Sequence, residues 1–134
     1  MLDGARVLIV EDDPQLAELF AESVEECEGR VVGPFSGFRE TKRHIETEGA
    51  PDGAILDFRL ADGEVTPIST YLQERGIPVV ICTGVYVPVR MRETAPNFAY
   101  IPKPVSPHEV VARLAAMMHD HRRPDLSGET KRDR

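Results

Sequence analysis

Side chains capable of chemistry occur at four places in this sequence where an apolar run stops. These residues are Glu11 with Asp12, Asp57, Thr83 and Lys103. If the four places adjoin in the fold, three carboxylates, a hydroxyl and an amine share one pocket. Carboxylates held together repel one another, which raises their proton affinity unless a cation joins them. Hard oxygen ligands of this kind suit Mg²⁺.

Asp57 directly follows a short apolar run that begins at Gly53. A continuous apolar run bounded by turn formers suits a strand covered on both faces, as in a parallel sheet, although four residues also fit a helix. Ligand crevices of open α/β sheets lie outside the carboxyl ends of their strands, so a carboxylate there is placed for chemistry. The alternative is that Asp57 only begins a loop, because Asp is a common turn residue.

The elements that must position these residues are predicted from apolar periodicity. Four more short apolar runs predict strands at residues 5–10, 30–33, 77–82 and 98–101. Amphipathic spacing and end signals predict helices from Pro14 until Gly29, over 38–48, from Pro67 until Gly76 and from Pro107 to Met118.

Local end signals sharpen these predictions at two points. Asp13, before Pro14, is the natural N-cap of the first helix, which explains that acid without chemistry. Pro34 is expected to end the second strand. The segment 85–97 holds two prolines, and we expect it to be the least regular part of the chain.

Strand and helix alternate five times, which argues for a parallel sheet with helices on both faces and right-handed crossovers. Neighbouring strands lie about 4.8 Å apart, so adjacent strand ends would crowd one edge of the sheet. Each polar residue has an ordinary explanation by itself. A coincidence at four strand ends is much harder to explain in that way.

Composition limits the classes of function. A chain of 134 residues, 41 % hydrophobic and 29 % charged, suits one globular domain, and no apolar run approaches the length of a membrane helix. Nothing at the amino end resembles a signal peptide. The net charge of -7 argues against a nucleic-acid binder. Cys27 and Cys82 form no metal-ligand spacing and are expected to be reduced and packed, which favours a cytoplasmic location.

The chain resembles the receiver domain of bacterial two-component response regulators. The matching pieces extend over residues 5 to about 119 and are Val10-Glu11-Asp12-Asp13-Pro14, Ile55-Leu56-Asp57 followed by Asp62-Gly63, Cys82-Thr83-Gly84 and Pro102-Lys103-Pro104-Val105. The resemblance implies a flavodoxin-like, doubly wound α/β fold with a five-stranded parallel sheet of order 2-1-3-4-5. It also implies a phosphoacceptor rather than an enzyme, phosphorylated on Asp57 by a histidine kinase or a phosphotransfer protein.

The same resemblance implies a Mg²⁺ site. Asp12 and Asp57 would be direct ligands, Glu11 would act mainly through water, and the backbone carbonyl of Arg59 would complete the set. Arg59 and Val85 also occupy positions that tune phosphate lifetime in this family. We therefore expect an altered rate of autodephosphorylation, although the side chain of Arg59 could simply be solvated.

Three further residues receive roles from the resemblance. Lys103 would pair with a phosphate oxygen, and the hydroxyl of Thr83 would donate to another. Tyr100, three residues before the lysine, would turn inward as the switch aromatic; its other reading is an ordinary half-buried strand tyrosine. The family also leads us to expect a cis bond before Pro104.

The domain is expected over residues 1–119, with a disordered tail at 120–134. A stand-alone receiver of this kind would signal through protein contacts, with an unknown downstream target and a possible homodimer. One alternative is a phosphorylation-independent interaction module with the same fold. Another is a Mg²⁺-dependent aspartyl-phosphate hydrolase of the haloacid-dehalogenase kind, which is disfavoured because that family has a second Asp where this chain has Arg59.

Overall fold

The computed structural model describes residues 1–84 and 97–122. Its strands are β1 (Arg6–Val10), β2 (Arg30–Phe35), β3 (Gly53–Asp57), β4 (Arg59–Leu60), β5 (Gly63–Glu64), β6 (Val79–Thr83) and β7 (Phe98–Pro102). Its helices are α1 (Pro14–Glu26), α2 (Phe38–Glu48), α3 (Thr66–Glu74) and α5 (Pro107–Arg122).

Five of the strands form one parallel sheet in the order β2-β1-β3-β6-β7. Numbered among these five strands alone, the order is 2-1-3-4-5, so the flavodoxin-like prediction is confirmed. The strands that carry the candidate residues, β1, β3, β6 and β7, are consecutive neighbours.

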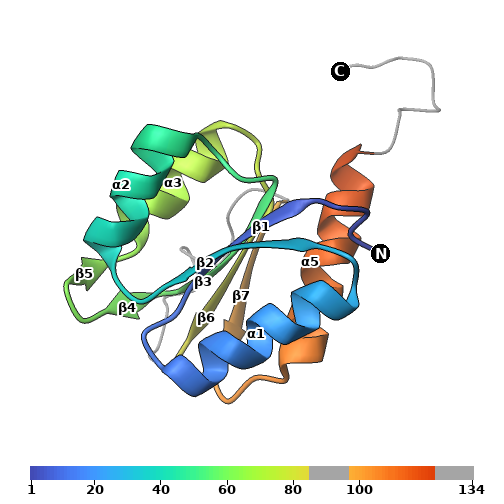
Figure 1. Cartoon of the computed structure of the whole chain (residues 1–134), viewed down its shortest axis with the longest axis horizontal. Coiled ribbons are helices and arrows are strands. Elements are labelled where there is room, and N and C mark those ends of the chain that lie inside the picture. Colours follow the sequence, from blue (N-terminus) through green and yellow to red (C-terminus); the bar gives the residue numbers. More distant parts are fainter. Residues whose placement is uncertain (85–96, 123–134) are drawn as a thin grey trace.

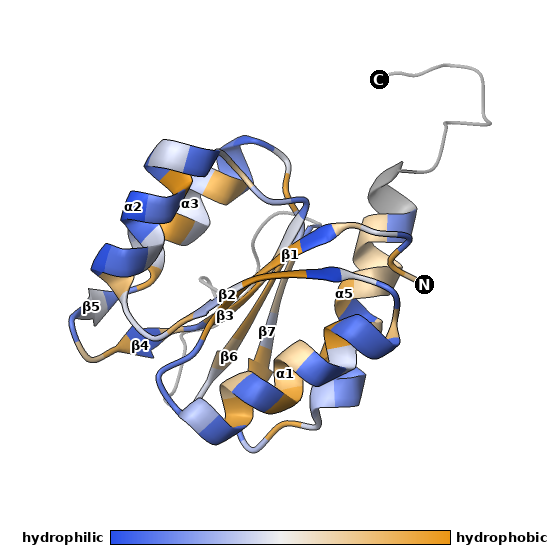
Figure 2. Ribbon diagram, in the orientation of Figure 1, coloured by the Kyte–Doolittle hydropathy of each residue, from blue (hydrophilic) through white to orange (hydrophobic). Residues whose placement is uncertain are grey.

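The helices cover both faces of the sheet, with α1 and α5 on one face and α2 and α3 on the other (Figure 1). Successive residues of a strand point to opposite faces. Val7 and Ile9 of β1 therefore pack in the core beneath α1 and α5, whereas Leu8 and Val10 pack in the core beneath α2 and α3. The central strands are apolar along their length, and the apolar sides of the helices turn toward them (Figure 2).

The face under α5 is tightly packed. A Cβ atom on Gly53 of β3 would lie 2.8 Å from the Sδ atom of Met118 in α5. The missing side chain therefore lets this helix lie close against the middle of the sheet.

The second strand differs from the prediction, because β2 continues through Pro34 to Phe35. Leu8 pairs with Val32 but Val10 pairs with Phe35, so β2 contains one extra residue in this interval. Proline is tolerated here because β2 is an edge strand and because a bulge leaves an unpaired position. The bond between Gly33 and Pro34 is cis.

A small hairpin that the sequence did not predict follows Asp57. Strands β4 and β5 pair antiparallel around a two-residue turn, and the N–H of Val65 donates to the carbonyl of Phe58 at 3.0 Å. Leu60 and Val65 are buried in the core beneath α2 and α3. The chain after the acidic strand end is therefore an anchored hairpin rather than an open polar loop.

Two expectations concern parts of the chain at the limits of the described residues. The segment predicted to be irregular, 85–97, lies outside them except for its last residue. Helix α5 extends to Arg122, and residues 123–134 of the expected tail are also outside them.

Candidate functional site

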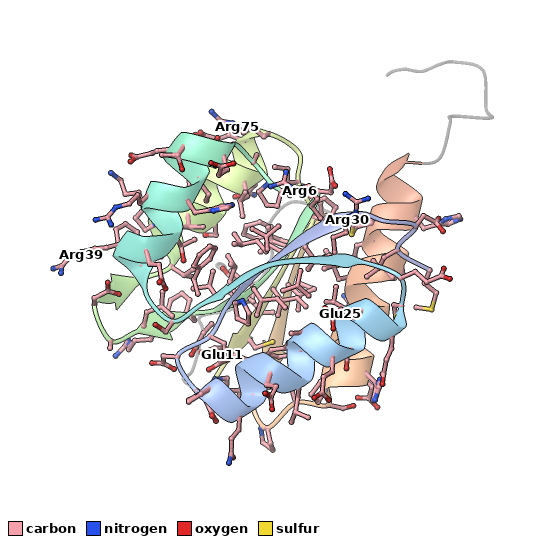
Figure 3. All side chains as sticks on the ribbon, viewed as in Figure 1. Arg6, Glu11, Glu25, Arg30, Arg39 and Arg75 are labelled. Atoms are coloured by element: carbon pink, nitrogen blue, oxygen red, sulfur yellow. The ribbon has the colours of Figure 1, made fainter. Side chains whose placement is uncertain are left out.

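The sheet brings the chemically capable strand ends to one edge. In the parallel register Val10 pairs with Leu56, Asp57 with Cys82, and Thr83 with Pro102, so the carboxyl ends of four neighbouring strands lie side by side. Figure 3 shows Glu11 at this edge, with Arg6 and Arg30 at the opposite end of the sheet. The predicted clustering of these strand ends is present in the fold.

Three carboxylates form the centre of the site. Glu11, Asp12 and Asp57 each offer an oxygen atom, and these atoms all lie within 4.8 Å of one another. Glu11 and Asp57 are buried, with residue exposures of 2 % and 6 %, whereas Asp12 is exposed. Two of the three carboxylates are therefore buried, and the third is accessible to solvent.

Backbone contacts hold Glu11 in place. Its Oε2 atom accepts the N–H of Asp13 at 3.1 Å, and its own N–H donates to the carbonyl of Phe35 at 2.9 Å. Asp13 is the N-cap of α1, as predicted, and its Oδ1 atom accepts the N–H groups of Gln15 and Leu16. The turn after β1 is thereby fixed by the start of α1 on one side and by β2 on the other.

Lys103 crosses the site from the end of β7. Its Nζ atom donates to Oε2 of Glu11 at 3.2 Å and to Oδ2 of Asp57 at 3.3 Å, and lies 3.1 Å from Oε1 of Glu11. Its own N–H donates to the carbonyl of Thr83 at 2.7 Å. The bond between Lys103 and Pro104 is cis, as expected. One ammonium group thus serves two buried carboxylates.

Burial shifts the pKa values of these groups. Desolvation and, to a lesser extent, the charge of Asp57 raise the pKa of Glu11 to about 7, against the opposing contacts with Asp13 and Lys103. Desolvation also raises the pKa of Asp57, while the charge of Lys103 opposes the shift. Desolvation acts to lower the pKa of Lys103, but its hydrogen bond to Glu11 and the two negative charges outweigh this and raise it. Considering residues 1–84 and 97–122, the pocket therefore holds more negative than positive charge.

The residues present fit a hard divalent cation. All donors in the cluster are carboxylate oxygens, the ligand type that Mg²⁺ and Ca²⁺ prefer. Oε1 of Glu11 is buried and, although Lys103 is near it, accepts no hydrogen bond from the part of the chain that the structure describes. This oxygen is stabilised by the charge of Lys103 at 3.1 Å but receives no well-directed donor from the described residues. A cation coordinated directly or through water would satisfy it.

The remaining predicted residues occupy three different environments. Thr83 is buried at the end of β6. Tyr100 is half-buried on β7, in edge contact with Phe98, and burial raises the pKa of its phenol. The side chain of Arg59 is 63 % exposed and lies 3.9 Å from Glu64, so its guanidinium group is directed to the surface of the hairpin rather than into the acidic cluster.

Asp62 is a residue whose contacts the sequence interpretation missed. It accepts hydrogen bonds from two backbone N–H groups of α2, those of Phe38 and Arg39. Nothing in the sequence pairs these positions. The sequence gives one indirect indication: Gly37, just before the predicted second helix, has no side chain that could cap it, so the helix needs a cap from elsewhere.

Several known proteins similar to this chain are named as response regulators or as their receiver domains. The DNA-binding response regulator MtrA of Mycolicibacterium smegmatis is 30 % identical over 120 residues, which cover 84 % of this chain and 50 % of that protein. The solution structure of SdrG from Sphingomonas melonis Fr1 is 30 % identical, with a TM-score of 0.69, and the match covers 89 % of this chain and 99 % of that one. A response regulator receiver protein from Sinorhizobium medicae WSM419 has a TM-score of 0.77 at 16 % identity, covering 90 % and 99 % of the two chains.

The extent of these matches differs. The chain spans about half the length of the curated relative that it matches, and nearly all of the solved structures of SdrG and of the Sinorhizobium protein. No protein-family profile matches the chain. None of the helices in the described ranges combines the length and the apolar character needed to cross a membrane.

Proposed function

Because this chain belongs to the receiver-domain family of response regulators, we propose that it accepts a phosphoryl group on Asp57 and passes the signal on through protein contacts. One observation carries the proposal. The buried carboxylate of Asp57 lies beside Glu11 and Asp12 and within 3.3 Å of the ammonium of Lys103, at the carboxyl edge of the sheet. Receiver domains are signalling modules that are generally not enzymes.

The proposed step is an in-line transfer from a phosphohistidine. A carboxylate oxygen of Asp57 forms a bond to phosphorus as the bond between phosphorus and the histidine nitrogen breaks, and the electron pair of that bond leaves with the imidazole. The product is an acyl phosphate, which water can hydrolyse. The donor in this proposal is a histidine kinase or a phosphotransfer protein.

Glu11, Asp12 and Asp57 would hold a Mg²⁺ ion together with the backbone carbonyl of Arg59. When bound, the ion neutralises the acidic pocket and offsets negative charge on the incoming phosphoryl group. Lys103 is placed to exchange its contact with Asp57 for a phosphate oxygen, which it would meet as a point charge. Thr83, buried at the neighbouring strand end, would donate its hydroxyl to another phosphate oxygen.

The switch proposed for this domain involves Thr83 and Tyr100. Both are on neighbouring strands, where Ile81 of β6 pairs with Tyr100 of β7. A movement of Thr83 toward the phosphate would leave space that the half-buried ring of Tyr100 is placed to fill. The downstream target would read this change on the surface near β7.

The test is phosphorylation by a small donor. The protein is incubated with Mg²⁺ and acetyl phosphate, and its intact mass is measured, with Asp57→Asn as the control. We expect one phosphate on the wild type and none on the variant. A folded wild-type protein that gains no phosphate from acetyl phosphate, phosphoramidate or a phosphorylated histidine kinase would contradict the proposal and favour a phosphorylation-independent interaction module.

A further inference from the structure

The amino-terminal end of α2 is capped by a residue from a distant part of the chain. Its N-cap, Gly37, has no side chain, so the first N–H groups of the helix need other acceptors. Oδ1 of Asp62 accepts the N–H of Phe38 at 2.6 Å, and Oδ2 accepts the N–H of Arg39 at 3.2 Å. Figure 3 shows the side chain of Arg39 directed away from the protein, so the contact is made by its backbone.

Asp62 is at the tip of the hairpin that follows the proposed phosphoacceptor. Only Phe58 separates Asp57 from β4, and the turn between β4 and β5 consists of Ala61 and Asp62. The base of the hairpin is held by the N–H of Phe58, which donates to the carbonyl of Cys82 at 3.1 Å, and by buried Leu60. The contact with α2 fixes the opposite end of the hairpin.

The shape of the α2 terminus suits this contact. A Cβ atom on Gly37 would lie 3.0 Å from Oδ1 and 3.1 Å from Oδ2 of Asp62. These distances are tighter than ordinary contacts, so a side chain at this position would push the carboxylate away. The glycine that leaves α2 without its own cap is also what allows Asp62 to provide one.

We propose that Asp62 is a positioning residue for the cation site, acting through the hairpin rather than by contact with the ion. By tying the hairpin tip to α2, it restricts β4 and therefore the backbone of Arg59, whose carbonyl the proposed function assigns to Mg²⁺. The carboxylate of Asp62 is not a member of the acidic cluster. This inference rests on the proposed function for the identity of the ion.

A compensating variant distinguishes two roles of Asp62, capping α2 and positioning the cation site. Asp62→Ala removes both the cap and the tether. Gly37→Ser in the same protein gives α2 a cap of its own, since position 37 has the extended backbone of an N-cap (φ -146°, ψ 170°) and the carboxylate that would clash is gone. The double variant therefore regains the helix cap without regaining the tether.

Mg²⁺ affinity is measured by calorimetric titration of the full chain, and backbone hydrogen exchange of residues 58–65 is measured by mass spectrometry. We expect both variants to bind Mg²⁺ about tenfold more weakly than wild type, as for other residues that orient metal ligands, and to exchange faster over 58–65. The unfolding midpoint should fall in Asp62→Ala and return in the double variant. Asp52→Ala is the control, because Asp52 accepts the N–H of Arg6 at the other end of the sheet, and its Mg²⁺ affinity should equal that of wild type.

Two results would overturn the inference. Wild-type affinity in the double variant would show that Asp62 acts only as the cap of α2, and wild-type affinity in Asp62→Ala would show no role at the site. If Asp62→Ala does not fold, the double variant with its restored cap decides the question. Failure of the wild-type protein to bind Mg²⁺ would instead contradict the proposed function, and this inference with it.

Discussion

The ammonium nitrogen of Lys103 lies 3.3 Å from Oδ2 of Asp57, although the two residues are 46 positions apart in the sequence. The same nitrogen also lies 3.1 Å from Glu11, so among the described residues one ammonium group compensates two buried carboxylates. Removing this charge should therefore lower the stability of the cation-free, unphosphorylated protein.

Lys103→Met should lower the free energy of unfolding without Mg²⁺ by about 1–3 kcal/mol, because buried acceptors lose their donor. Saturating Mg²⁺ should stabilise this variant more than it stabilises wild type, since the ion replaces the missing charge. Urea unfolding with and without Mg²⁺ measures both effects. Lys42→Met is the matched control, because Lys42 forms an exposed ion pair with Glu46 on α2 and should show the wild-type response to Mg²⁺. An equal response of all three proteins would contradict the prediction.

The stability of the cation-free protein should fall as the pH rises through neutrality. Burial raises the pKa of Glu11 from 4.5 to about 7, so the folded state keeps a proton that the unfolded state releases. The contribution of this group is fully present below pH 4.5 and is lost as the pH rises through about 7. The raised pKa of Asp57 acts in the same direction.

Glu11→Gln should remove this component, because the amide cannot ionise. We expect the free energy of unfolding to fall more between pH 5.5 and pH 8 in wild type than in the variant, when both are measured by urea unfolding without divalent ions. Any pH-dependent contribution that the two proteins share cancels in this comparison. The charge on Lys103 does not change in this range, since its pKa is raised above 10.5. Parallel pH profiles would exclude Glu11 as the source.

Arg59 offers a test of phosphate lifetime. Its exposed guanidinium lies near Glu64, within reach of the solvent side of the hairpin. We expect Arg59→Ala to change the hydrolysis rate of the acyl phosphate on Asp57 severalfold, if the side chain turns from the hairpin surface toward the phosphate and contacts it or blocks attacking water. Loss of phosphate is followed by intact mass after the donor is removed. Arg39→Ala changes an outward-pointing arginine on α2 and should decay like wild type (Figure 3); equal rates for Arg59→Ala and wild type would refute the expectation.

Tyr100 tests the switch. Tyr100→Ala should leave the extent of Asp57 phosphorylation unchanged, because the ring is not part of the acidic cluster. In the variant, phosphorylation should change the backbone NMR chemical shifts of fewer residues far from Asp57 than it does in wild type. Phosphorylation-dependent partner binding should also be weaker. Tyr100→Phe keeps the ring and is expected to behave like wild type. The same shift changes in the alanine variant as in wild type would exclude Tyr100 as the switch.

The fold was predictable because each sheet strand is a short apolar run followed by a turn or a helix start. Burial of β3 and β6 on both faces requires the near-continuous apolar runs seen at Gly53–Leu56 and Val79–Cys82. The clustering of Glu11, Asp12, Asp57 and Lys103 then follows from the strand order, which the resemblance to receiver domains implied and the apolar runs by themselves did not fix. The sequence therefore predicted the centre of the candidate site, whereas the roles given to its residues remain predictions.

Two features were not predictable from local pattern. Pro34 ordinarily ends a strand, but pairing with β1 carries β2 past it by means of a bulge. The hairpin after Asp57 has strands of two residues each, which are too short to show the alternation of apolar and polar residues typical of a strand. Its hydrogen bonds to α2 join residues that are 23 and 24 positions apart in the sequence. Such contacts depend on tertiary geometry, and the residue types involved are those of any turn.

The bulge in β2 also affects how copies of this domain can meet. An exposed edge strand normally presents a regular row of N–H and C=O groups on which a second sheet can grow. At this edge Pro34 has no N–H to offer, and the extra residue breaks the regular spacing of the others. Continuous sheet extension across this edge is therefore obstructed, which disfavours strand-to-strand aggregation there.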